Sequence, residues 1–104
     1  MAARIKIRTK LADGVTMVRV LMIHPMETGL RKDRETGEPI PVHYIREVLC
    51  EHNDRVVLKA YWGIAISKNP YLSFRLNGAV PGDTITISWI DNRGASASEK
   101  AIIE

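Results

Sequence analysis

The side chains of this sequence that could bind a metal are concentrated in its first half: His24, Met26, Met17, Met22 and Cys50. Imidazole, thioether and thiolate groups are the ligands that copper favours. A blue-copper site takes two histidines, one cysteine and usually a weak axial methionine, with cysteine, histidine and methionine together on one late loop. Here Cys50 is followed by His52, but no methionine occurs after Met26. We therefore predict no metal and no cofactor, and we expect the earlier methionines to pack in the core.

The histidines do not form a recognisable hydrolytic site either. His24, His43 and His52 are present beside several serines, but no Gly-x-Ser-x-Gly or His-Glu-x-x-His segment accompanies them. The acids between residues 27 and 38 are expected to be solvated or paired with Arg31 and Lys32. No glycine-rich segment opens a helix that could cradle a phosphate. The spacing of these side chains therefore predicts no catalytic residues.

Cys50 is the single cysteine, so no disulfide can form within the chain. It lies in the strand-like segment Val48–Glu51, where a small buried thiol is the usual arrangement. A reactive thiol needs exposure and an electropositive neighbourhood, whereas the adjacent Glu51 is an acid. We expect an inert core residue, with a reactive thiol as the alternative.

Composition indicates one ordinary globular domain covering residues 1–104. The chain is 45% hydrophobic and 26% charged, which is typical of a folding sequence. The net charge of +3 comes from 15 basic and 12 acidic residues, and the densest basic segment, Arg31–Glu35, contains two acids. This favours a solvated loop over a nucleic-acid site. No run approaches the roughly 20 apolar residues of a membrane span. Because Met1–Lys10 lacks the apolar core of a signal peptide, we expect that the chain is not exported by itself.

The elements that position these residues are predicted to be strands. Alternating apolar and polar residues between turn signals place them at Arg4–Arg8, Val15–His24, Val42–Glu51, Val56–Tyr61, Tyr71–Leu76, Thr84–Ile90 and Ser96–Ile103, with a further short run at Ile64–Ile66. The apolar run at Val15–His24 predicts a central strand buried on most of both faces. Helix competes with strand at Ile45–Leu49, but the β-branched and aromatic residues there and the preceding prolines favour strand. We predict an all-β fold, an immunoglobulin-like antiparallel β-sandwich of about seven strands.

A long connection from His24 to Ile45 joins two of these strands. It contains glycines, prolines and charges of both signs, so its polar centre should face solvent. A connection of this length without secondary structure is usually either functional or disordered. We therefore expect a binding role here before anywhere else.

Several segments together carry a resemblance to a known family. They are His24–Asp33 (HPMETGLRKD), Ile40-Pro41, Ser67–Phe74 (SKNPYLSF), Gly82-Asp83 and Trp89–Gly94 (WIDNRG). These segments, which extend over nearly the whole chain, resemble the SoxZ family, the smaller subunit of the SoxYZ carrier of bacterial thiosulfate oxidation. The combination of a His-x-Met-Glu-x-Gly segment with an Asn-Pro-Tyr segment about forty residues later is more specific than either alone.

The resemblance implies a noncatalytic subunit with an immunoglobulin-like fold. In that family the partner SoxY presents a cysteine on a flexible Gly-Gly-Cys-Gly-Gly arm, and sulfur intermediates travel on that thiol between enzymes. This chain ends in Lys100–Glu104 without glycine or cysteine, so it resembles only the Z partner, and Cys50 is not expected to carry sulfur because a strand supplies no flexible tether. The implied partners are a SoxY-like subunit, in a heterodimer or a higher oligomer, and transiently the Sox enzymes, with neither nucleic acid nor membrane. The implied location is the periplasm, reached by co-export with a signal-bearing SoxY.

The residues predicted to bind partners lie mainly in the long connection: His24, Met26, Glu27, Leu30, Arg31, Lys32, Asp33 and Tyr71. Tyr44 and Trp62 are further candidates that could equally be core residues. Heterodimer formation is expected to cover an exposed sheet face or edge, and the charged residues would tune association rate. An internal pair between Arg31 and Glu27 that only orders the loop is the alternative. Two other functions stay open: a periplasmic adhesion- or chaperone-like β-sandwich module, and a copper-binding one.

Overall fold

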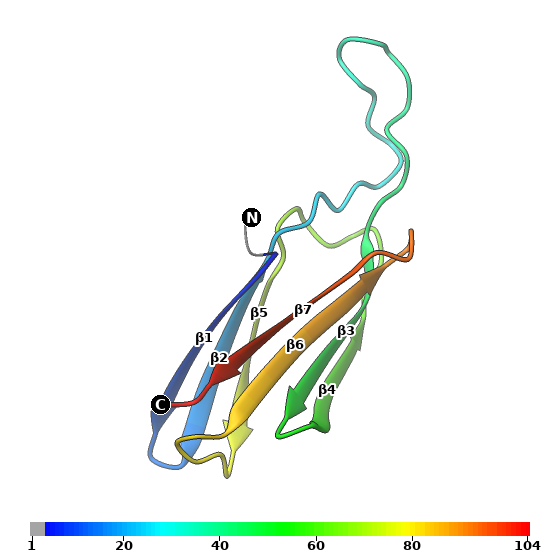
Figure 1. Ribbon diagram of the computed structural model, residues 1–104. Helices are drawn as coiled ribbons and strands as arrows, with labels where there is room; N and C mark the ends of the chain where they lie inside the picture. Colours follow the sequence, from blue (N-terminus) through cyan, green and yellow to red (C-terminus); the bar gives the residue numbers. More distant parts are fainter. Residues whose placement is uncertain (1–3) are drawn as a thin grey trace.

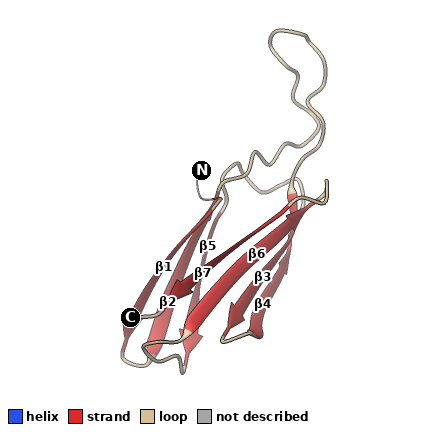
Figure 2. Cartoon of the chain, in the orientation of Figure 1, coloured by secondary structure: helices blue, strands red, loops and turns tan. Residues whose placement is uncertain are grey.

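A computed structural model describes residues 4–104 of the chain, which form seven strands joined by turns and loops (Figure 1). The strands are β1 (Ile5–Ala12), β2 (Val15–Met22), β3 (Ile45–His52), β4 (Arg55–Tyr61), β5 (Tyr71–Asn77), β6 (Thr84–Asp91) and β7 (Ser96–Ile102). The described residues include no helix, and so none that could span a membrane (Figure 2). The segment at Ile45–Leu49 is strand, as the β-branched residues indicated.

The strands form two antiparallel sheets that pack face to face. One sheet has the order β1-β2-β5 and the other has the order β4-β3-β6-β7. Along one side β1 lies against β7 of the opposite sheet, whereas β5 and β4 are the free edges of their sheets. The predicted immunoglobulin-like β-sandwich of about seven strands is therefore confirmed.

The core lies between the two sheets and follows the period of two that strands impose. Val18 and Val20 of β2 face inward, and Val48 of β3 and Ile85 and Ile87 of β6 complete the centre with no exposed surface. Removing each such side chain from water stabilises the fold by roughly 1.5–3 kcal/mol. The alternation predicted for Tyr71–Leu76 and Thr84–Ile90 is confirmed.

Two of the predicted turns are tight hairpins with left-handed backbone. Asp13 and Gly14 join β1 to β2 with φ of 53° and 76°, and Asn53 and Asp54 join β3 to β4 with φ of 49° and 66°. Two consecutive positive φ angles match the right-handed twist of the flanking strands. Asn, Asp and Gly tolerate this conformation best, which is why the sequence locates both turns.

Two expectations were wrong in detail. The short run at Ile64–Ile66 is a turn and not an eighth strand, and Ile66 packs against the core from that turn. The strand at 15–22 is central in its sheet, but it is not buried on both faces: Arg19 is exposed, and Met17 and Leu21 are half-buried. The reason is that no third layer covers the outer face of this sheet, so apolar residues there are only partly shielded by their neighbours.

Residues 23–44, here called the arm, project well beyond the ends of the strands (Figure 1). The molecule is consequently elongated, with extents of 53 × 22 × 22 Å. The arm is an irregular hairpin, because backbone hydrogen bonds join Glu27 to His43, Ile40 to Arg31 and Asp33 to Glu38. Its outer part is exposed, as its polar composition predicted.

Candidate functional site

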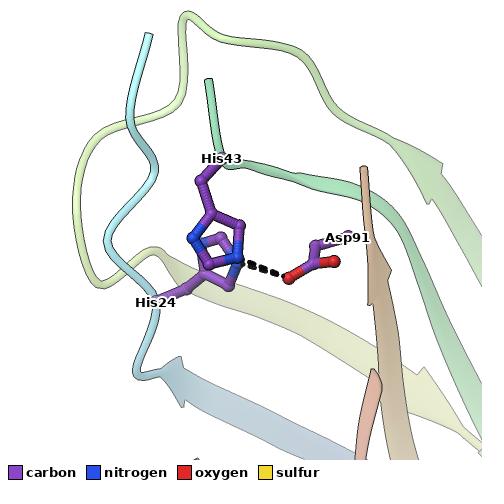
Figure 3. A group of neighbouring side chains, drawn as sticks. All are labelled: His24, His43 and Asp91. Carbon is purple, nitrogen blue, oxygen red and sulfur yellow. Dashed lines mark hydrogen bonds and ion pairs between the residues drawn. The ribbon is translucent and has the colours of Figure 1, made fainter. Parts of the chain in front are cut away.

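Three ionisable side chains meet at the root of the arm, where it leaves the sandwich (Figure 3). His24 follows the end of β2, His43 precedes the start of β3, and Asp91 is the last residue of β6. The Nε2 atoms of His24 and His43 lie 3.1 and 2.7 Å from the same carboxylate oxygen, Oδ2 of Asp91. Both ends of the arm are therefore tied to one buried carboxylate.

The hydrogen bonds assign the proton of His24. The backbone N–H of Met26 donates to Nδ1 of His24 at 3.1 Å, so Nδ1 carries a lone pair and the proton sits on Nε2, which donates to Asp91. The other carboxylate oxygen accepts the backbone N–H groups of Arg93 and Ala95, each at 2.9 Å. Asp91 thus accepts four hydrogen bonds and holds both sides of the β6–β7 turn as well as the arm.

The electrostatics of the cluster follow from burial and these bonds. Burial by itself raises the pKa of Asp91, but the hydrogen bonds from His24, His43, Ala95 and Arg93 outweigh it and lower the pKa to about 2. His24 is only 3% exposed, and its burial lowers its pKa despite the favourable bond to Asp91. Its ring also meets Trp89 edge-on, with ring centroids 5.1 Å apart. The site is thus a neutral imidazole held by an ionised carboxylate.

The ligand atoms of His24, His43 and Asp91 lie within 4.8 Å of one another, close enough to share a metal ion. A metal ligated by Nε2 needs that nitrogen free of its proton, with the proton on Nδ1 and donated to a second-shell acceptor. The bond from Met26 N–H requires the opposite tautomer at His24. The hydrogen bonding therefore fits a structural role better than a metal site. His24, His43 and Asp91, which together hold both ends of the arm, are here called the clasp.

The arrangement also lacks a nucleophile. Within residues 4–104, no hydroxyl or thiol forms a hydrogen bond to the imidazole of His24 or His43. A general base needs the proton that it abstracts within hydrogen-bond reach. The hydrogen bonds that the cluster makes within the described residues all tie segments of the chain together.

Two asparagines complete the clasp on either side of these residues. The backbone of His24 donates to Oδ1 of Asn69 at 3.1 Å and accepts the N–H of Asn69 at 3.0 Å. Asn92 accepts from the N–H of Tyr44 at 2.8 Å and donates to the carbonyl of Val42 at 3.0 Å. Three segments that carried the resemblance, 24–33, 67–74 and 89–94, therefore meet at the arm's root.

The predicted partner-binding residues are distributed along the arm and do not form one patch. His24 and Met26 are buried, and Met26 accepts the N–H of Ile45 on its sulfur at 3.3 Å. They can serve a partner only by holding the arm in place. Further out, Glu27 pairs with Arg31 at 3.1 Å, so the intramolecular pairing considered as an alternative is present.

The exposed members of the set lie in two places. Leu30 is 84% exposed on the arm, and Lys32 and Asp33 are exposed beyond it. Tyr71 is 60% exposed at the start of β5, on the sandwich itself. Tyr44 and Trp62 are half-buried against the core. Whether these residues bind a partner stays a prediction.

Sequence reasoning missed Asp91 as a site residue and did not connect His43 with His24. Asp91 lies 67 positions after His24 and 48 positions after His43. No local spacing pattern marks a cluster of residues so far apart in the sequence. Asn69 and Asn92 lie within the segments of the resemblance, which was the available signal. The expectation that Cys50 is a core residue is confirmed: its side chain is fully buried, and burial raises its pKa to about 11.

Comparison with known proteins gives a match to a protein family. The family described as "Sulphur oxidation protein SoxZ" matches residues 5–101 of the 104-residue chain. No curated protein shows significant similarity to the chain. The match covers all seven strands except the last residue of β7, and it includes the whole arm and its clasp.

Proposed function

Because the chain belongs to the SoxZ family and is therefore a component of the Sox sulphur oxidation system, we propose that it is the noncatalytic subunit of a SoxYZ-type sulfur carrier. It binds and supports a SoxY-like subunit, whose flexible C-terminal segment contains the cysteine that carries covalent sulfur intermediates during thiosulfate oxidation. The observation that carries this proposal is the family match over residues 5–101.

The state of Cys50 supports a role without chemistry of its own. A thiol that accepts and delivers sulfur must ionise and reach several active sites. Cys50 is fully buried in β3, and its pKa is raised to about 11. It meets neither requirement, so the sulfur-bearing thiol belongs to the partner.

The exposed apolar side chains support a role in binding a partner. Leu30 protrudes from the arm at 84% exposure, and the free edge strand β4 exposes Val57 and Tyr61 at 37% and 72%. Free edges and exposed apolar residues invite pairing with another chain. The clasp at the arm's root fixes the arm before binding, which reduces the ordering entropy lost on association.

We further propose that the complex functions in the periplasm. The chain would fold and assemble with a signal-bearing SoxY-like subunit before export, and the two would cross the membrane together. Contacts with Sox enzymes would be transient and would involve the complex rather than this subunit alone.

Co-expression with the SoxY-like subunit of the same organism tests the proposal. We expect an equimolar complex by size-exclusion chromatography. Leu30→Asp should weaken it by roughly tenfold or more, as expected for a truncated interface anchor. Val80→Asp is the matched control, because Val80 is also exposed (56%) but lies in the loop between β5 and β6, at the opposite end of the sandwich from the arm.

Two results would contradict the proposal. One is a chain that stays monomeric in the presence of the SoxY-like subunit, which would favour a stand-alone binding module. The other is sulfur covalently attached to Cys50 after turnover, detected by mass spectrometry of the intact subunit.

A further inference from the structure

The outer face of the β1-β2-β5 sheet, here called the basic face, gathers positive charge that is dispersed in the sequence. The strand register places one row of side chains from each strand on this face. Its cationic members are Lys6, Arg8, Lys10, Arg19 and Arg75. All five are exposed. Lys6, Arg8 and Lys10 alternate along β1, so all three side chains lie on this face.

No acid balances these cations. The positions of the three strands that share this face contain no Asp or Glu. None of the five cations forms an ion pair with any residue in the part of the chain that the structure describes. The net charge of the whole chain is only +3, so five cations without an acid among these positions make the charge of this face more positive than that of the rest of the molecule.

One pair on the face is unfavourable in the isolated chain. Arg8 and Arg19 are directly opposite each other in the β1–β2 register. Like charges in this relation destabilise a sheet. An anionic partner that sits between the two guanidinium groups would remove this repulsion, and carboxylates accept bidentate hydrogen bonds from arginine.

Apolar side chains lie between the cations. Met17 and Leu21 are half-buried, and Tyr71 is exposed next to Leu21. Arg8 and Arg19 line two adjoining shallow grooves of about 420 and 360 Å³, the first of which includes Met17 and the second Leu21 and Tyr71. The face thus combines a charged rim with recessed apolar surface, which is the composition of a protein interface.

We propose that the basic face binds a partner protein through an acidic surface with protruding apolar side chains. Carboxylates would pair with the arginines and lysines, while the apolar groups would enter the two grooves. Met17 and Leu21 are half-buried, so little apolar surface protrudes from this face to insert into a membrane. A single aromatic residue, Tyr71, gives no stacking platform of the kind that single-stranded nucleic acids use. This goes beyond the proposed function, because it assigns a second surface away from the exposed part of the arm.

The test uses a fluorescein-labelled peptide that alternates glutamate with leucine as the probe, with the full-length chain at low salt. The triple variant Lys6→Gln, Arg8→Gln and Arg19→Gln should lose roughly tenfold or more in affinity, because exposed charges act together. The control triple variant Arg55→Gln, Lys59→Gln and Lys100→Gln removes the same charge from exposed positions of the other sheet and should change affinity less than about twofold.

A second pair of variants tests the apolar part. Tyr71→Ser should weaken binding of the peptide even at high salt, because the contact is not screened. Ile102→Ser is its control, since Ile102 is as exposed (61%) but lies on β7 of the other sheet. Circular dichroism of all variants establishes that each is folded.

Three results would overturn the inference. They are equal losses in the two triple variants, no measurable binding of the peptide, and tighter binding of a single-stranded oligonucleotide or of phosphatidylglycerol vesicles than of the peptide. A chain that still holds the SoxY-like subunit while failing to bind the peptide would overturn this inference and leave the proposed function standing.

Discussion

Asp91 is the residue on which the root of the arm depends. It is 1% exposed and accepts four hydrogen bonds, two from histidines and two from the following turn. We expect Asp91→Ala to lower the free energy of unfolding by roughly 2–4 kcal/mol, because it leaves buried donors without an acceptor. Urea denaturation measures this.

The matched control is Glu99→Ala, which removes an exposed carboxylate from β7. It should change the free energy of unfolding by less than about 0.5 kcal/mol. Equal stabilities of the Asp91→Ala and Glu99→Ala variants would show that the clasp contributes nothing to the fold.

The titration of His24 makes stability depend on pH. Burial lowers its pKa in the folded state below the ordinary value of 6.5, so the unfolded chain binds the proton more readily. Stability is then full above pH 6.5 and falls as the pH drops from 6.5 to the folded-state pKa. Melting temperatures measured between about pH 8 and 5 should decline for the natural chain and less for His24→Gln. Parallel declines would mean that another group is responsible.

At more acidic pH the carboxylate contributes in the same direction. The pKa of Asp91 is lowered from 3.8 to about 2 in the folded state, so its stabilisation is present above pH 3.8. It is lost as the pH falls toward 2. As the pH falls, protonation of His24 should therefore weaken the clasp first, and protonation of Asp91 should weaken it further.

Sequence alone could locate His24 but not its carboxylate. His24 stands at the end of an apolar run beside a proline, where a strand must stop. In the sequence, Asp91 is typical of the first residue of a turn, and it has that role in the structure too. Its second role arises from tertiary pairing over 67 residues, and no single-sequence pattern contains that information.

At the scale of elements, the arm separates into a root and an outer hairpin. The outer hairpin closes through the bonds between Asp33 and Glu38 and between Ile40 and Arg31. Residues 31–39 are exposed, Ile40 is half-buried, and none of them belongs to the core. We expect that replacing residues 33–38 with Asn-Gly, a two-residue hairpin turn, changes the melting temperature by less than about 2 °C. Differential scanning calorimetry measures this.

The same shortened chain should bind the SoxY-like subunit at least about tenfold more weakly if the outer hairpin is part of the interface. A loss of stability comparable to that of Asp91→Ala would contradict the separation into root and hairpin. Unchanged affinity would restrict the interface to Leu30 and the sandwich.

The strands were predictable because period-two patterns and turn residues are local signals. The same patterns do not predict burial correctly, because burial depends on how many layers cover a sheet. Met17 and Leu21 are apolar, yet no layer covers their face of the sheet. The basic face escaped sequence reasoning for a related reason. Arg8, Arg19 and Arg75 belong to three strands, and only their register brings them together.

At the scale of the molecule, the arm and the basic face lie on different parts of an elongated body. The arm extends from one end of the sandwich (Figure 1), and the basic face runs along the side of the three-stranded sheet. This separation allows one partner to be held at the end while another approaches the side. The proposed SoxYZ-type carrier needs such simultaneous engagement of two partners, because it must remain assembled while enzymes act on it.

The shape gives a direct measurement of whether the arm is held out in solution. The radius of gyration is 15.7 Å, whereas a compact domain of this length has about 13 Å. The excess arises from the arm, which the clasp keeps directed away from the strands. We expect small-angle X-ray scattering of the natural chain to agree with the larger value, and the chain shortened at residues 33–38 to approach the smaller one.

The Asp91→Ala variant keeps every residue of the arm but loses the clasp, so its scattering should show a broader distribution of maximum dimensions. A natural chain that scatters as a compact sphere would mean that the arm folds back onto the sandwich, and the exposed Leu30 would then not be available to a partner.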